Sequence, residues 1–121
     1  MNNTVAKCIC AVGLMVFTSA GVGSEMGPAE GVISYYADAL HGNATASGEK
    51  YDKNKMTAAH KTLAFGTRVR VTNLDNGKSV LVVVNDRGPF VEGRILDVSR
   101  SAADQLDMGD VGLAKARIAV Q

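Results

Sequence analysis

The feature that most constrains the fold is an Asn-Gly pair between two β-strand patterns. Before it, in residues 67–73, β-branched residues alternate with Arg, which is the period-two pattern of a strand with one buried face. After it, residues 79–85 (SVLVVVN) contain an unbroken apolar run, which predicts a strand buried on both faces. Asn76-Gly77 favours a type I′ hairpin, because both turn residues need a positive φ. The centre of the chain is therefore predicted to be an antiparallel hairpin.

Similar strand patterns recur on both sides of this hairpin. The predicted strands are residues 32–36, 57–60, 67–73, 79–85, 95–98 and 113–120. Ser99 stands where it could N-cap one short helix over residues 101–106, in which alanines favour the helical state. The fold class is therefore mainly β. A small closed barrel would remove exposed strand edges, but periodicity alone does not choose between a barrel and a sandwich.

The first 20 residues have the pattern of a signal peptide. Lys7 is followed by an apolar run over residues 8–17, and Thr18-Ser19-Ala20 then offers small residues suited to cleavage. The run is too short for a transmembrane span, which needs about 20 mostly apolar residues. We therefore expect an exported protein, periplasmic or secreted, with no integral span after cleavage. Residues 21–30 are expected to form a short flexible lead, and residues 31–121 the folded domain.

Both cysteines, Cys8 and Cys10, lie inside the predicted signal peptide. The mature domain is then expected to have no disulfide and no thiolate chemistry. Neither cysteine has the Leu-small-small-Cys context of lipidation, so we expect no lipid anchor. Loss of Lys7 would leave 12 of the 13 basic residues against 12 acidic ones. A domain of this size without cross-links must rely on its apolar core.

Composition excludes several classes of protein. Hydrophobic residues make up 46% of the chain and charged residues 21%, which is unlike a disordered chain. The formal net charge of +1 provides no basic excess for binding nucleic acid. Aromatic residues make up only 5% and Trp is absent, so no broad stacking platform is evident.

Two carboxylates, Glu49 and Asp52, stand three residues apart after Gly48. A turn there could aim both side chains into one pocket. Enzymes that cleave glycosidic bonds usually use a pair of carboxyl groups, because a like-charged neighbour raises the pKa of the carboxyl group that acts as the acid. The alternative is an exposed acidic turn beside Lys50.

A third carboxylate, Asp86, follows the apolar strand and precedes Arg87-Gly88-Pro89. Partial burial there would favour the protonated acid. The alternative is an Asp that caps the turn, or that pairs with Arg87 or Arg94 and stays ionised. Asp97, between two apolar residues, is interpreted as a structural hydrogen-bond acceptor.

The two histidines give little support for a metal centre. His60 taken alone is more often a satisfied structural residue than a catalyst, and His41 lies in a polar loop. Without tight pairing they predict no metal site. No phosphate-binding or dinucleotide fingerprint occurs, so no cofactor is expected.

Several stretches together resemble a known family. They are SYY at 34–36, HG at 41–42, TASGE at 45–49, MTAAHKTL at 56–63, FGTRVRVTN at 65–73, NDRGPF at 85–90 and GRILDVS at 93–99. In this order they cover nearly all of residues 31–120, and they resemble the rare lipoprotein A (RlpA) family. The chain departs from the family pattern at Tyr35, where Trp is usual, and at Ala37, where Gly is usual. We therefore expect sugar stacking near the cleft to be altered.

This resemblance implies a six-stranded double-psi β-barrel with one short helix, related to expansins and barwin-like proteins. It also implies an endolytic lytic transglycosylase, which is a lyase of peptidoglycan. Such an enzyme cleaves the β-1,4 bond between N-acetylmuramic acid and N-acetylglucosamine and leaves 1,6-anhydromuramyl ends, with a preference for glycan strands that lack stem peptides. The alternative is a non-catalytic peptidoglycan-binding or wall-loosening module of the expansin kind. A third reading is a structural or inhibitory domain that binds protein partners.

The resemblance also implies roles for individual residues. Asp86 would act first as acid and then as base, with Glu49 and His60 as the other catalytic residues. The substrate-binding residues would be Asp52, Tyr36, Thr45, Asn85 and Arg87. The expected ligand is the glycan strand and not nucleic acid. Division-site cell-wall proteins are candidate partners, and a monomer is expected.

Overall fold

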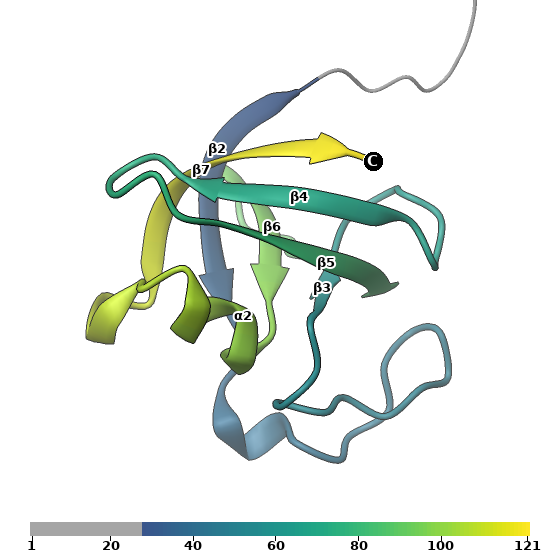
Figure 1. Ribbon diagram of the computed structural model, residues 1–121. Coiled ribbons are helices and arrows are strands. Elements are labelled where there is room, and N and C mark those ends of the chain that lie inside the picture. Colours follow the sequence, from purple (N-terminus) through teal and green to yellow (C-terminus); the bar gives the residue numbers. More distant parts are fainter. Residues whose placement is uncertain (1–27) are drawn as a thin grey trace, which may run out of the picture.

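The computed structural model describes residues 28–121, so the predicted signal peptide and most of the predicted lead lie outside the described residues. Figure 1 shows the elements in chain order. They are β2 (Ala29–Tyr35), the 3₁₀ helix η2 (Asp38–Leu40), β3 (Thr57–Ala59), β4 (Arg68–Asn73), β5 (Ser79–Asp86), β6 (Arg94–Val98), α2 (Arg100–Gln105), the 3₁₀ helix η3 (Gly109–Val111) and β7 (Leu113–Val120). No helix in this part of the chain is long and apolar enough to cross a membrane.

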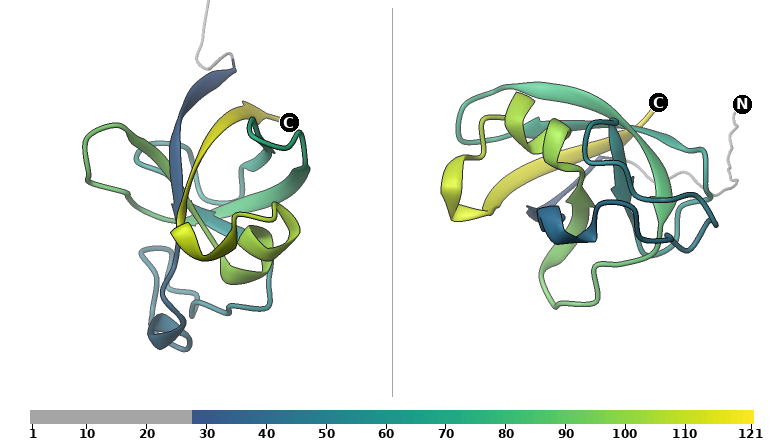
Figure 2. Two further views of the ribbon diagram at one scale, coloured as in Figure 1. Left: turned by 90° about the vertical axis from the view of Figure 1, so that its left-hand side faces the viewer. Right: turned by 90° about the horizontal axis from the view of Figure 1, so that it is seen from below.

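The six strands close into a barrel in the order β2-β6-β3-β5-β4-β7. Two neighbouring pairs, β2 with β6 and β3 with β5, are parallel, and the other pairs are antiparallel. The views in Figures 1 and 2 show the strands wrapping around a single interior. The predicted mainly-β, six-stranded barrel is therefore confirmed, and the sandwich left open by periodicity is excluded.

The predicted central hairpin is confirmed, but the predicted type I′ turn is wrong. Strands β4 and β5 pair from Arg68 opposite Val83 to Thr72 opposite Ser79. The connecting loop is longer than two residues, because the last strand pair is Thr72 with Ser79. Within the loop, the Gly77 amide donates to the Asn73 carbonyl at 2.7 Å.

Only Gly77 of the Asn-Gly pair has a positive φ, at 78°. The Asn76 side chain instead donates to the Leu106 carbonyl and accepts from the Lys78 amide. The Asn-Gly pair thus ends a wider loop and ties the hairpin to the chain that follows α2.

Strand β5 is buried on one face and not on two as predicted. Val80, Val82 and Val84 lie in the core, whereas Val83 is 36% exposed and Leu81 is half-buried. The physical reason is barrel closure, because each strand of a small barrel turns alternate residues inward and outward. An apolar run can therefore include residues that face outward.

Helix α2 packs against the core at one end of the barrel. Its predicted N-cap is confirmed, since Ser99 Oγ accepts from the Ala102 amide at 3.3 Å. Ala102, Ala103 and Leu106 belong to the same buried cluster as the inward valines. The helix thereby adds apolar contacts that the short strands alone do not supply.

The segment between β2 and β3, residues 36–56, extends beyond the same end of the barrel in Figure 1 and in the left view of Figure 2. It contains η2 and a tight excursion marked by an isolated bridge between Ala44 and Lys50. A hydrogen bond from the Ser47 amide to the Asn85 carbonyl joins this excursion to the end of β5. The segment therefore places Glu49 and Asp52 near the end of the strand that bears Asp86.

Candidate functional site

Asp86 is the last residue of β5, and three donors hold its half-buried carboxyl group. Oδ1 accepts from the Ala46 amide at 2.8 Å and from the Arg87 amide at 2.9 Å. The Tyr36 hydroxyl donates to Oδ2 at 2.5 Å. Of the two expected pairings with Arg87 and Arg94, neither forms an ion pair with Asp86 in residues 28–121. The carboxyl group is thus oriented by neutral hydrogen-bond donors.

Tyr36 is fixed in turn by an aromatic stack. Its ring lies on that of Tyr51, with centroids 4.3 Å apart and planes 13° from parallel. Burial raises the pKa of Tyr36, and the hydrogen bond to Asp86 acts in the same direction. The phenol therefore stays protonated and remains a hydrogen-bond donor to Asp86. Tyr51 is itself buried, and its hydroxyl accepts from the Arg100 amide at 3.0 Å.

Glu49 and Asp52 line one hollow, as their spacing suggested. We call it the Asp52 hollow; its volume is about 280 Å³. The lining residues are Glu49, Lys50, Asp52, Lys55, Thr57 and Asn85. Asn85 Nδ2 donates to Glu49 Oε1 at 3.2 Å. The residue beside Asp86 thus holds the Glu49 carboxylate at the edge of this hollow.

Thr45 stabilises the turn over residues 45–49, which contacts Asp86 and carries Glu49. Its hydroxyl donates to the Glu49 carbonyl at 2.6 Å, and its amide donates to the same oxygen at 2.8 Å. The side chain is buried. The 45–49 turn therefore presents the Ala46 amide to Asp86 on one side and the Glu49 side chain to Asn85 on the other.

His60 is buried next to the main chain of Asp86. Its Nδ1 accepts from the amides of Thr62 and Leu63, at 3.1 and 3.0 Å, so a neutral ring carries its proton on Nε2. Burial lowers the pKa of His60, and the positive charges of Arg87 and Lys61 lower it further. The His60 amide donates to the Asp86 carbonyl at 3.1 Å. The structure thus joins His60 to Asp86 through the backbone.

Arg87 braces the loop that follows His60. Its Nη1 donates to the carbonyls of Leu63, at 2.7 Å, and His60, at 3.3 Å. The guanidinium group lies over the Phe65 ring, 4.1 Å from its centroid. These contacts make Arg87 a support for the 60–65 loop.

Asp97 is a structural acceptor, as predicted. The Ser34 hydroxyl donates to Asp97 Oδ1, and Arg94 Nη1 donates to the Ser34 oxygen at 3.3 Å. The charge of Asp97 also contributes to the raised pKa of Tyr36. The resemblance did not assign a role to this group or to the Ala46 amide. A backbone donor has no side-chain signature, so the sequence carried no signal for Ala46.

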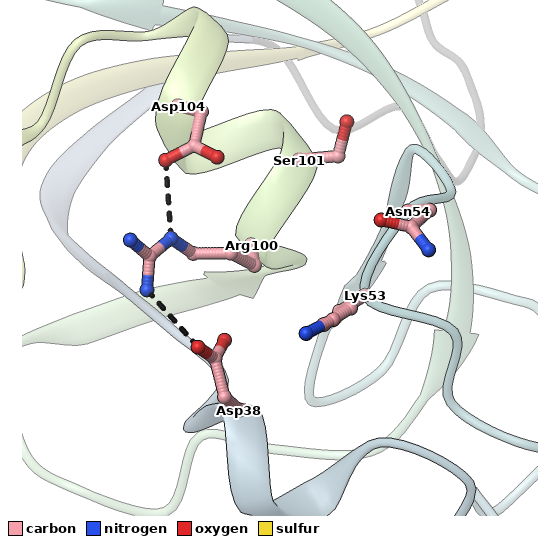
Figure 3. A pocket seen from close by; sticks show the side chains of 6 residues that line it. All are labelled: Asp38, Lys53, Asn54, Arg100, Ser101 and Asp104. Atoms are coloured by element: carbon pink, nitrogen blue, oxygen red, sulfur yellow. Dashed lines mark hydrogen bonds and ion pairs between the residues drawn. The ribbon is translucent and has the colours of Figure 1, made fainter.

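A separate polar pocket of about 300 Å³ lies beside α2 and is shown in Figure 3. It is lined by Asp38, Lys53, Asn54, Arg100, Ser101 and Asp104. Arg100 contacts Asp104 at 3.1 Å and Asp38 at 3.5 Å, which ties η2 to the helix. None of the predicted site residues lines this pocket, and it is distinct from the Asp86 site. Across residues 28–121, no three His, Cys, Asp or Glu side chains gather as a metal-binding group.

Comparison with known proteins identifies the family of the chain. A family model described as "Lytic transglycolase" matches residues 28–118. The chain is 56% identical over 89 residues to a probable endolytic peptidoglycan transglycosylase RlpA of Treponema pallidum. The matched region covers 74% of this chain and 28% of the relative. It is 51% identical over 92 residues to the endolytic peptidoglycan transglycosylase RlpA of Campylobacter jejuni, covering 76% of this chain and 34% of the relative. The chain therefore spans only about a third or less of these relatives.

Solved structures share the fold. An apo expansin of Clavibacter michiganensis superposes with a TM-score of 0.59 and 26% identity, covering 78% of this chain and 50% of that one. A Streptomyces papain inhibitor superposes with a TM-score of 0.59 and 22% identity. The superposition covers 77% of this chain and 93% of the inhibitor. These neighbours identify the closed barrel as the double-psi type. The matched family model and the identity to the curated relatives show that the chain belongs to the RlpA family of lytic transglycolases.

Proposed function

We propose that this domain is an endolytic lytic transglycosylase that cleaves the β-1,4 bond between N-acetylmuramic acid and N-acetylglucosamine in peptidoglycan. The observation that carries the proposal is the Asp86 carboxyl group, which three neutral donors orient at the end of the barrel. The Asp52 hollow is lined by Asn85, the residue that precedes Asp86, and not by Asp86 itself. The names of the relatives, endolytic peptidoglycan transglycosylases, support the same reaction.

The proposed reaction needs one carboxyl group that works in both directions. Asp86 first gives its proton to the glycosidic oxygen as the bond to C1 of the muramic residue breaks. The C6 hydroxyl of the same residue then bonds to C1, and its proton returns to Asp86. No water is consumed, one end of the product carries a 1,6-anhydro bridge, and the acid is regenerated.

The hydrogen bonds of Asp86 select the oxygen that would carry the proton. Oδ1 already accepts from two backbone amides, so both of its lone pairs are engaged. The transferable proton is therefore assigned to Oδ2, beside the Tyr36 hydroxyl. After the proton leaves, Tyr36 donates to the new negative charge, and charge-assisted hydrogen bonds are the stronger kind.

The other predicted residues then take distinct positions. Glu49 and Asp52 face the Asp52 hollow and are assigned to the sugar, with Asn85 orienting Glu49. The side chains of Thr45, His60 and Arg87 bond to the main chain, and the Thr45 hydroxyl also bonds to that of Ser47. We therefore assign these three to holding the loops around Asp86, and Tyr36 to holding its carboxyl group.

We propose peptide-free glycan as the preferred substrate. Removal of a stem peptide leaves a free lactyl carboxylate on the muramic residue. Lys50 and Lys55 both line the Asp52 hollow and could pair with this anion. The domain would act as a monomer outside the cytoplasmic membrane, where peptidoglycan lies, and division-site wall proteins are its proposed partners.

Release of soluble fragments from purified peptidoglycan tests this function. The chain should release fragments, and faster from peptide-free than from peptide-bearing strands. Asp86→Asn should lower the rate by at least about 100-fold, the usual contribution of a positioned acid. Asp110→Asn is the matched control, because Asp110 is exposed on η3 and its replacement should leave the rate unchanged. An Asp86→Asn variant as active as the wild type would remove Asp86 as the acid, and no release by the wild type would refute the function.

A further inference from the structure

The tyrosines of the barrel are already engaged with other side chains. Tyr36 and Tyr51 cover one another, and Tyr51 is only 2% exposed. The Tyr35 ring lies under the guanidinium of Arg100, which is 5.5 Å from its centroid and lines the pocket beside α2. None of these three lines the Asp52 hollow. The other aromatic rings of residues 28–121 are those of Phe65 and Phe90, and the candidate for sugar stacking is the one that lines a hollow.

Phe65 is such a ring. It lies in the loop between β3 and β4, next to Gly66, and is 43% exposed. The Arg87 guanidinium covers one face of the ring. Since that face is covered and much of the ring is still exposed, the open face is the opposite one. The same guanidinium is held by the His60 and Leu63 carbonyls, so the ring is backed by a fixed group.

Phe65 lines a second hollow, of about 190 Å³, which we call the Phe65 hollow. Its lining residues are Ser47, Glu49, Phe65, Gly66, Val83, Val84 and Asn85. Glu49 and Asn85 also line the Asp52 hollow, so the two hollows meet at the hydrogen bond between these two side chains. The residue that precedes Asp86 is thus common to both hollows.

The chemistry of the Phe65 hollow fits a pyranose ring. Phe65 and the 36%-exposed Val83 supply apolar surface, and Ser47, Glu49 and Asn85 supply polar groups around it. A pyranose has C–H bonds on its faces and hydroxyl groups at its edge. The negative face of an aromatic ring attracts such C–H groups, and a ring held in place in advance loses little entropy on binding.

We propose that Phe65 is a sugar-stacking residue, and that the Phe65 hollow is a subsite for one sugar of the glycan strand whose neighbour occupies the Asp52 hollow. This inference rests on the proposed function. The proposal also accounts for the outward position of Val83, whose side chain would add apolar surface beside Phe65. The substrate would then cross the Glu49–Asn85 pair, next to Asp86.

The chain contains no Trp, so one introduced Trp reports on its own position. We would place Phe65→Trp in an Asp86→Asn background, so that glycan binds without being cleaved, and titrate it with peptide-free glycan strands. The expected result is a saturable change in Trp emission. The matched control is Val111→Trp in the same background, because Val111 is 80% exposed on η3 and lines neither hollow. Its emission should not change.

Kinetics of otherwise wild-type protein provide the second readout. Phe65→Ala should raise KM about tenfold and leave kcat within about twofold, since stacking binds the substrate without touching the reacting atoms. Phe65→Tyr should restore KM, whereas Phe65→Leu, which keeps apolar bulk without an aromatic face, should not. Thermal unfolding of each variant separates lost stacking from lost stability.

The outcomes distinguish this inference from the function on which it rests. If the wild type cleaves glycan, but Phe65→Ala keeps the wild-type KM or the two Trp reporters respond alike, the Phe65 subsite is overturned and the proposed function stands. If the wild type neither binds nor cleaves glycan, the proposed function fails and the subsite fails with it. Should Phe65→Ala not fold, the Trp titration decides alone.

Discussion

At the scale of single residues, the site depends on contacts between parts of the chain that are far apart in the sequence. Asp86 is predictable from its place after an apolar strand and from the family resemblance. Its partner Tyr36 lies 50 residues away, and the Ala46 amide lies 40 residues away. No periodicity relates these positions. Sequence therefore indicates the carboxyl group proposed to react but not the donors that orient it.

Tyr36→Phe tests the hydrogen bond to Oδ2 of Asp86. The phenyl ring can keep its stack on Tyr51, so the fold should be retained. Loss of a donor to a charged group is worth about 1.5–3 kcal/mol, so kcat should fall at least about tenfold while KM stays near the wild-type value. Steady-state kinetics on soluble glycan strands check this result.

Tyr51→Phe is the control for this variant. It keeps the same stack and removes only the hydrogen bond with the Arg100 amide. If both variants slow the reaction equally, the proposed role of the hydrogen bond from the Tyr36 hydroxyl to Asp86 is contradicted.

His60 predicts a pH dependence of stability. Because burial lowers the pKa of His60 in the folded state, the unfolded chain binds a proton first as the pH falls through the ordinary histidine range near 6.5. Stability from this residue is present above that range and is lost below it. His60→Asn can still accept from the Thr62 and Leu63 amides but cannot titrate.

Urea unfolding at pH 7 and at pH 5 measures this effect. The wild type should lose more free energy of unfolding between the two pH values than His60→Asn, since carboxylate contributions are common to both. Equal losses would mean that His60 titrates alike in the folded and unfolded chains.

At the scale of elements, the strands were largely predictable and their surroundings less so. Residues 113–120 form β7 as predicted, and Ser99 caps α2. The apolar run of β5 was misread, because composition shows that residues are apolar but not how many faces of a strand the fold covers. The Asn-Gly turn was misread because the Asn76 side chain makes a tertiary hydrogen bond to Leu106.

Adjacent valines in β5 test the one-sided burial directly. Val82 is fully buried and Val83 is 36% exposed. Val82→Ala should lower the free energy of unfolding by about 2 kcal/mol through lost burial and a cavity. Val83→Ala should change it by no more than about 0.5 kcal/mol, as is usual at the surface. Chemical unfolding of both variants would contradict the barrel register if the two losses were similar.

At the scale of the whole molecule, closure of the barrel brings the site together. Tyr36 follows β2, which pairs with β6, and Asp86 ends β5, which pairs with β3. The antiparallel pairing of the short β3 with β6 joins these two pairs, and Tyr36 then meets Asp86. Strand periodicity could not select this order, because it carries no information on which strands become neighbours. The family resemblance did predict the double-psi barrel, since it compares the ordered series of motifs and not single strands.

The central claim is that the chain cleaves glycan by internal attack of the C6 hydroxyl and without water. The most direct measurement is mass spectrometry of the products formed from peptide-free glycan strands in water labelled with heavy oxygen. We predict muramyl ends that are one water lighter than hydrolysis products and that carry no label, and no such products from Asp86→Asn. Labelled ends with a free C1 hydroxyl would identify a hydrolase that activates water, and intact strands would identify a module that does not cleave glycan; either result contradicts the mechanism proposed for Asp86.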